Sequence, residues 1–198
     1  VDLALRSSEW ASILRDAIEE SPEPSVPALL LEWLADRNGD HDALRDALRA
    51  QAEAASEPSL RASLWLDHAL AENEAGDVDA ALASLDLAAE SEALAWPARS
   101  LKRSLAQQHQ RLDAWETASV AMARQLEGDV PLDPLDLSTP IEEQLPLAAC
   151  LWREAASIRL AREGDSSRAR EYLEAALRQT PNDAELRWQL LQLGEKSG

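Results

Sequence analysis

The sequence predicts an all-α fold in which helical hairpins stack one on another as an α-solenoid. The main observation is an internal repeat: a Gly-Asp pair is followed by a small, a large apolar and a small residue at steps of four and three, which mark one helix face. The two copies are Gly76-Asp77 with Ala81, Leu85 and Ala88, and Gly164-Asp165 with Ala169, Leu173 and Ala176. β-branched residues do not alternate over any useful run, so strands have no support. With 45% hydrophobic residues, the 198-residue chain can bury a core, and we predict one domain over 1–198.

The first half of the chain divides at its proline and glycine turns. An extra N-terminal helix is expected over 8–20, where Trp10, Ile13 and Leu14 share a stripe before Pro22 and Pro24. The first hairpin is expected over 26–54 and turns at Asn38-Gly39-Asp40. The second is expected over 59–91 and turns at Gly76-Asp77.

The second half repeats this plan with departures. A third hairpin is expected over 97–126, where His109 takes the place of the glycine and Ala114 aligns with Ala81. The periodicity then stops over 128–146, which we interpret as an irregular, acidic insertion that folds back over the helices. The capping box Thr139-Pro140-Ile141-Glu142 predicts a short turn of helix, and Pro146 then predicts a break or kink, with a fresh helix start near 147. The fourth hairpin is expected over 147–179, and Thr180-Pro181 opens a C-terminal capping helix over 182–193.

These spacings resemble the tetratricopeptide repeat, whose period is 34 residues. Counting Gly76 as position 15 puts Trp65 at position 4, where that family favours Trp, and puts Ala81, Leu85 and Ala88 at its small, bulky and small positions. The fourth hairpin keeps the same pattern and the closing Pro181, but it has Trp152 one residue early. The resemblance covers about 25–181, with two well-formed and two degenerate repeats.

The resemblance implies a right-handed superhelix whose first helices line a concave groove that binds an extended peptide or a partner helix. Carried over position by position, the groove would present a set of nine candidate binding residues. They are Leu29, Trp33, Leu66, Leu70, Asn73, Arg99, Arg103, Glu154 and Ile158. Of the seven Trp residues, most are expected in the core, and Trp33 is the one expected in the groove.

The net charge of −18 argues against nucleic acid and anionic membrane surfaces as partners, because both are bound mainly through Lys and Arg. No apolar run reaches the length of a membrane span. Against this acidic background, Arg99, Lys102, Arg103 and Arg111 stand together with no acid over 98–112. They either anchor an acidic peptide, pair internally with the acidic stretch 127–143, or form a solvated face.

Catalytic and metal sites have no support, and no cofactor is expected. His41, His68 and His109 fall in different repeats, and His68 with Glu72 offers only two metal ligands. Cys150 is the sole cysteine, so the compartment stays open; we favour the cytoplasm, with the periplasm requiring a removed signal peptide. The chain begins with Val1, which suggests a processed form or an excised piece of a longer protein.

The sequence therefore predicts a non-catalytic protein–protein interaction scaffold from a bacterial protein. The partner is expected to be a protein or peptide, and self-association is possible. One alternative is a regulatory or sensor segment of a larger signalling or transcription protein. Another is a purely structural spacer.

Overall fold

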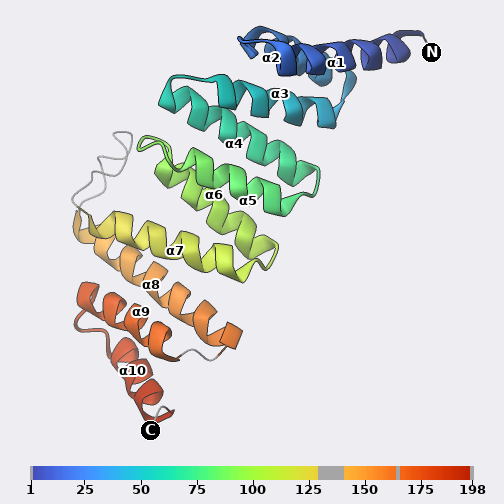
Figure 1. The fold of residues 1–198 in the computed structure, drawn as a ribbon. Coiled ribbons are helices and arrows are strands. Elements are labelled where there is room, and N and C mark those ends of the chain that lie inside the picture. Colours follow the sequence, from blue (N-terminus) through green and yellow to red (C-terminus); the bar gives the residue numbers. More distant parts are fainter. Residues whose placement is uncertain (1, 129–140, 164–165, 197–198) are drawn as a thin grey trace. The chain divides into compact units, whose positions relative to one another are not determined.

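The computed structural model describes residues 2–128, 141–163 and 166–196, without the side chains of 2–7, 141–146, 163, 195 and 196. Within these ranges the chain forms ten α-helices and no β-strand, which confirms the all-α prediction (Figure 1). The chain divides into two compact units, unit 1 (residues 1–98) and unit 2 (residues 99–198). Each unit is described by itself below.

The helices follow the predicted order. Those of unit 1 are α1 (Asp2–Glu20), α2 (Ser25–Asn38), α3 (His41–Ala54), α4 (Pro58–Glu74) and α5 (Val78–Ala88). The boundary between the units falls inside α6 (Ala95–Gln108), and unit 2 continues with α7 (Leu112–Glu127), α8 (Ile141–Glu163), α9 (Ser166–Gln179) and α10 (Ala184–Lys196). From α1 to α5, and again from α7 to α10, each helix packs mainly against the next one along the chain.

Two hairpin turns of unit 1 are built in the same way. Gly39 and Gly76 have φ of 63° and 85°, the left-handed region that glycine enters without steric cost. The N–H groups of Gly39 and Gly76 reach back three residues, and those of Asp40 and Asp77 reach back five, which is the Schellman pattern. Each aspartate side chain then caps the following helix by accepting from a backbone N–H three residues on.

The turn between α6 and α7 shows that the predicted register was wrong by one residue. Gln110, and not His109, adopts the left-handed conformation, with φ of 56°. Its N–H bonds to Gln107 and the N–H of Arg111 bonds to Ala106, which repeats the Schellman pattern without a glycine. The residue that corresponds to Ala81 is therefore Trp115, and not Ala114.

Helix α8 corrects the prediction of a break at Pro146. The helix begins at Ile141 and runs without interruption to Glu163. Because Pro146 is only the sixth residue of α8, it removes one intrahelical hydrogen bond, to residue 142 in the first turn. Residues 129–140 of the predicted insertion lie outside the described residues, and so does the prediction that they fold back over the helices.

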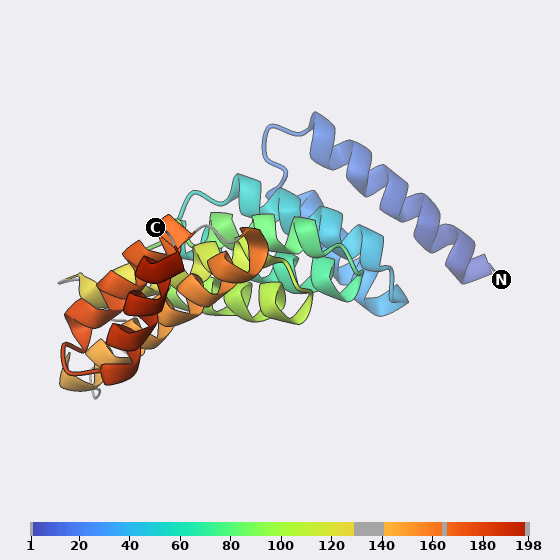
Figure 2. The same ribbon diagram turned by 90° about the horizontal axis from the view of Figure 1, so that it is seen from below.

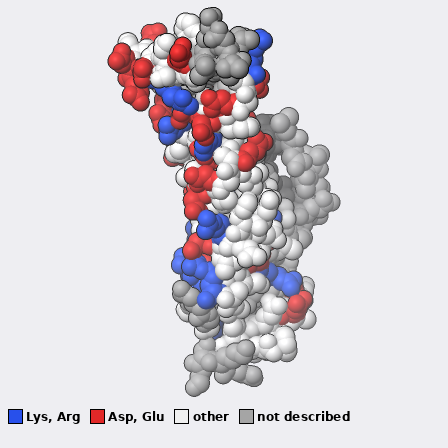
Figure 3. Space-filling view, turned by 90° about the vertical axis from the view of Figure 1, so that its right-hand side faces the viewer, with Lys and Arg blue, Asp and Glu red and all other residues white. Residues whose placement is uncertain are grey.

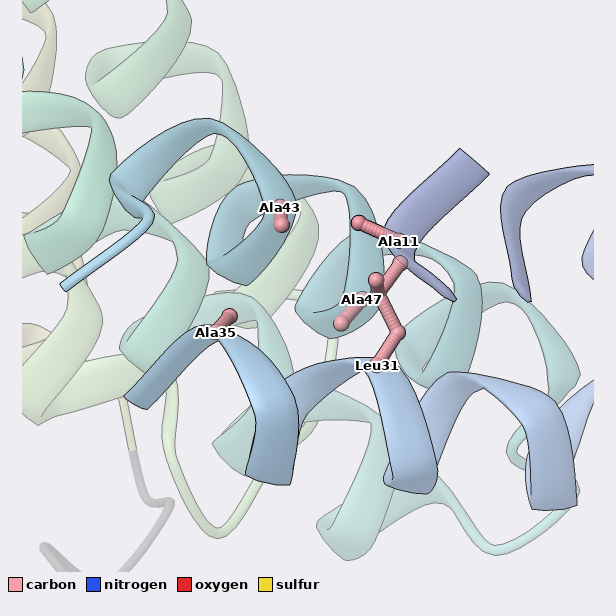
Figure 4. Close-up of a cluster of buried hydrophobic side chains, with 5 residues drawn as sticks. All are labelled: Ala11, Leu31, Ala35, Ala43 and Ala47. Atoms are coloured by element: carbon pink, nitrogen blue, oxygen red, sulfur yellow. The ribbon is translucent and has the colours of Figure 1, made fainter. Parts of the chain in front are cut away.

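The core of unit 1 consists mostly of alanine and leucine, which allow the helices to approach closely. Helices α1, α2 and α3 meet at a buried cluster of five residues (Figure 4). Its members are Ala11, Leu31, Ala35, Ala43 and Ala47, none more than 3% exposed. Beyond this contact, the first turns of α1 project past the other helices of unit 1 (Figure 2). Among the described residues, no helix combines the length and apolarity needed to cross a membrane.

Candidate interaction surface

Helix α2 is apolar on two opposite faces. One face, with Ala28, Leu31 and Ala35, is buried. The opposite face carries Val26, Leu29, Leu30 and Trp33, which are 64%, 54%, 52% and 59% exposed. Spacings of three, four and seven residues place these four side chains on a single stripe, here called the α2 stripe. A surface helix normally has a polar outer face, so the α2 stripe is a candidate contact surface.

The α2 stripe ends at a cation. The Arg37 guanidinium lies 5.0 Å from the centroid of the Trp33 ring, one helical turn further along α2. This cation–π contact holds the indole ring against its own helix while one side of it stays open to solvent.

Helix α4 adds less to this surface than predicted. Of the three predicted residues, Leu70 is 45% exposed, whereas Leu66 and Asn73 are half-buried. Leu66 packs against the core cluster that contains Trp65. Of these three residues, Leu70 is therefore the one that the structure presents to solvent.

Acidic side chains stand near α2 and α4. The Glu32 carboxylate accepts a hydrogen bond from Gln51 at 2.6 Å. Burial raises the pKa of Asp67, and the negative charge of Glu32 raises it further, so carboxylates of α2 and α4 repel each other. Some charges elsewhere in unit 1 are paired, as in Arg15–Asp46 at 2.8 Å. Figure 3 shows acidic and basic side chains side by side over the first helices.

In unit 2, the residues predicted for the groove point elsewhere because of the shifted register. The outer face of α6 carries Ser100, Ser104 and Gln107, all exposed and each one residue after a position predicted from His109. Arg99 instead donates a hydrogen bond to Gln125 of α7 at 2.5 Å. Arg103 is likewise turned toward its neighbouring helices.

Arg103 and Glu154 bind each other. Two guanidinium nitrogens of Arg103 donate to the two carboxylate oxygens of Glu154, each at 2.6 Å, and Ser119 donates to the same carboxylate at 2.6 Å. Burial would raise the pKa of Glu154, but the hydrogen bonds from Arg103 and Ser119 outweigh it and hold this pKa below its usual value. Arg103 is therefore paired within the chain, as one of the three alternatives predicted, but its partner Glu154 lies outside the predicted acidic stretch 127–143. The pair joins α6, α7 and α8.

Ile158 belongs to the core of unit 2, because it is only 4% exposed. Trp152 is also buried, at 5% exposed, and stacks in a tilted contact with Tyr172. The exposed residues of α8 include Ser157 and Leu160, each placed as expected if Trp152 marks position 4 of the repeat. Trp152 therefore predicts the register of α8 better than Gly164 does.

Two buried polar networks were not predicted. In unit 2, Glu116 is 3% exposed and accepts from Arg159 at 2.7 Å and from the Tyr172 hydroxyl at 2.9 Å. Burial, and then the hydrogen bond to Glu116, raise the pKa of Tyr172. The sequence shows a glutamate at position 116 but gives no sign that partners 43 and 56 residues away reach it.

In unit 1, His68 lies between a hydroxyl and a carboxylate. Its Nδ1 is 2.8 Å from Ser84 Oγ and its Nε2 is 3.3 Å from Glu72, whose other oxygen accepts from Arg45 at 2.7 Å. This order of groups resembles a nucleophile and its base, but Ser84 is only 4% exposed, so no substrate reaches it. The network therefore links α3, α4 and α5 as a structural element.

Two clefts lie away from the α2 stripe. One, of about 520 Å³, lies between α1 and α3 and is lined by charged residues that include Arg15, Asp46 and Arg49. The other, of about 460 Å³, lies between α8, α9 and α10 and is lined by apolar, serine and glutamine side chains. Neither combines a nucleophile with a base, and the described residues contain no group of three or more His, Cys, Asp or Glu placed to hold a metal.

Comparison with known proteins adds no identity to this geometry. No family model matches the sequence, and no curated protein is found as a relative.

Proposed function

We propose that this chain is a tetratricopeptide-like α-solenoid that serves as a non-catalytic scaffold for protein–protein interaction, with the α2 stripe as its main contact surface. The repeat character is supported by three turns with the same hydrogen-bond pattern, two of which, at Gly76 and Gln110, are 34 residues apart. That spacing is the period of the tetratricopeptide repeat.

The observation that carries the binding role is the exposure of Val26, Leu29, Leu30 and Trp33 on a single helix face. Burying a large apolar side chain that is exposed to water is favourable by roughly 1.5–3 kcal/mol when burial is complete. A partner that covers the α2 stripe recovers this free energy. Trp is also enriched among the residues that dominate interface affinity. A helix-sized ridge suits a partner helix or a peptide better than a small molecule.

The test compares the proteins that three forms of the chain capture from a lysate. The variant Leu29→Ser/Trp33→Ser removes two residues of the α2 stripe. The matched control, Leu191→Ser/Trp188→Ser, removes the same residue types from α10, where they are 68% and 58% exposed. We expect wild type and control to capture the same proteins and the α2 variant to lose them. Identical sets from all three forms would rule out the α2 stripe, provided that circular dichroism shows the variants folded.

A further inference from the structure

The α2 stripe has acidic neighbours without cationic partners. Asp36 lies on α2 beside the stripe, and Asp67 lies on the exposed side of α4, three residues from Leu70. Both side chains are exposed, and within the described part of the chain neither carboxylate forms a hydrogen bond or an ion pair. Glu32, one helical turn before Asp36 on α2, accepts a hydrogen bond from Gln51 and forms no ion pair with any described residue.

The arginines near this surface are engaged elsewhere. Arg37 stacks on Trp33, and Arg61, at the start of α4, donates two hydrogen bonds to the Ala55 carbonyl. Arg45 of α3 is bound to Glu72 and Asp42. Arg37 thus contributes one positive charge at this surface against the three negative charges of Glu32, Asp36 and Asp67, so the surface keeps a negative balance in a chain whose net charge is −18.

The carboxylates also act on each other. The pKa of Asp67 is raised, first because its carboxylate is partly desolvated and then by the charge of Glu32, so the two groups repel each other. A cation placed between them relieves this repulsion, whereas an anion increases it. An approaching partner is thus selected by its charge as well as by its shape.

We propose that the α2 stripe and its acidic border bind an amphipathic helix that carries large aliphatic residues on one face and Lys or Arg beside them. The inference rests on the proposed binding role of the α2 stripe and adds the chemistry of the partner. From Val26 to Trp33 the stripe spans about 10 Å, or two turns, so the partner needs only two to three turns to cover it. Its aliphatic side chains cover the stripe, and its cations meet Asp36, Glu32 and Asp67.

Two fluorescently labelled synthetic peptides test the proposal against the whole chain. Both carry leucines at helical spacings of three, four and seven; one has Lys and the other Glu at the flanking positions. Fluorescence anisotropy is measured over a range of salt concentrations. We expect the Lys peptide to bind at least about tenfold more tightly than the Glu peptide, with a difference that shrinks as salt is raised.

Paired variants separate this surface from the general acidity of the chain. Asp36→Asn/Asp67→Asn is expected to weaken binding of the Lys peptide by about three- to tenfold. The control Glu53→Gln/Glu90→Gln removes the same charge from exposed residues elsewhere in unit 1 and is expected to change binding by less than about twofold. An equal loss in the control would overturn the proposal, because it would show attraction to the net charge alone.

The remaining outcomes separate the partner's chemistry from the role of the surface. Equal binding of the two peptides, lost in both for Trp33→Ala, overturns the charge preference and leaves the α2 stripe as a binding surface. Binding of both peptides unchanged by Trp33→Ala overturns both proposals. Dimers in sedimentation that Leu29→Glu abolishes would identify a second copy of the chain as the occupant, which also overturns the inference.

Discussion

The residues predicted for the groove from the first helices of the hairpins behave in opposite ways in the two units. In unit 1, Leu29 and Trp33 of α2 are more than half exposed. In unit 2, Arg103 and Glu154 were predicted for the same positions, but they turn inward and bind each other. The difference teaches that a residue predicted from its repeat position is placed correctly only when the register of its helix is known. A shift of one residue along the helix converts an outward position into one that bonds neighbouring helices.

This comparison also separates stability from binding. The Arg103–Glu154 pair holds three helices together, so its loss should lower the free energy of unfolding. The α2 stripe contributes little packing within the chain, so its loss should weaken partner binding and leave the free energy of unfolding nearly unchanged. Mutations in the two regions test this division directly.

The largest effect is expected from Glu154→Ala. The change leaves the Arg103 guanidinium without its carboxylate, whereas Ser119 keeps the Trp115 carbonyl as an acceptor. Breaking a buried pair from one side costs about 3–5 kcal/mol. Because the side chains of Arg103 and Glu154 are 32% and 18% exposed, we expect the lower part of this range or less, about 2–3 kcal/mol, in urea unfolding. The control is Glu174→Ala, which breaks an exposed pair with Arg170 and should cost less than about 0.5 kcal/mol. Equal costs would show that the Arg103–Glu154 pair does not hold unit 2 together.

Substitutions at two of the turns should change the free energy of unfolding by about 1 kcal/mol, with a loss at Gly76 and a gain at Gln110. Gly76→Ala puts a side chain on a left-handed residue; a Cβ there meets no atom within 4 Å, so the expected loss reflects backbone conformation alone. Gln110→Gly does the reverse and should stabilise unit 2, although the greater freedom of glycine in the unfolded chain offsets part of the gain. Both changes are measured by urea unfolding. Destabilisation by Gln110→Gly would mean that the Gln110 side chain matters more than its backbone conformation.

The His68 network makes unit 1 sensitive to pH. Burial lowers the pKa of His68 below its usual 6.5; Glu72 and Asp46 act against this shift, and Arg45 and Arg49 add to it. The unfolded chain therefore binds a proton that the folded chain resists, so stability is complete above pH 6.5 and decreases as pH falls toward the lowered value.

The measurement for His68 is the free energy of unfolding at several pH values between 7 and 5. His68→Gln should flatten the dependence in this interval, whereas His109→Gln, which changes an exposed histidine, should leave it as in wild type. A wild-type slope that persists in His68→Gln would assign the proton to another group.

The smallest change in the free energy of unfolding is expected for Trp33→Ala, the variant for which we expect a large loss of partner binding. Trp33→Ala removes a side chain that is 59% exposed, so the free energy of unfolding should move by no more than about 0.5–1 kcal/mol, part of it from the lost contact with Arg37. The same urea titration checks this prediction. A loss above 2 kcal/mol would mean that Trp33 supports the fold, and the contrast between the units would fail.

The elements of the fold follow from local signals in the sequence, whereas the pairing of charges does not. Gly39 and Gly76 mark their turns because glycine adopts the left-handed conformation readily. The two hairpins of unit 1 lie within three residues of their predicted bounds, whereas α1 begins six residues before its predicted start. Gln110 gives no such signal, since glutamine rarely adopts that conformation. The turn was therefore placed at His109, and the predicted register of α6 was wrong by one residue. Arg103 and Glu154 are 51 residues apart, and only the packed helices bring them together. On the candidate surface, Trp33 was predicted because Gly39 fixes the register of α2, although the first hairpin is one of the two degenerate repeats.

The packing of each helix mainly against its sequence neighbour has a consequence for how the chain folds. Contacts between neighbours close short loops, so the entropy lost before each contact forms is small, and folding should be fast. The pair α7 and α8 differs, because thirteen residues, 128–140, separate the end of one helix from the start of the other. We expect this pair to form after α8 and α9, which pulse-labelling hydrogen exchange would resolve as later protection of α7.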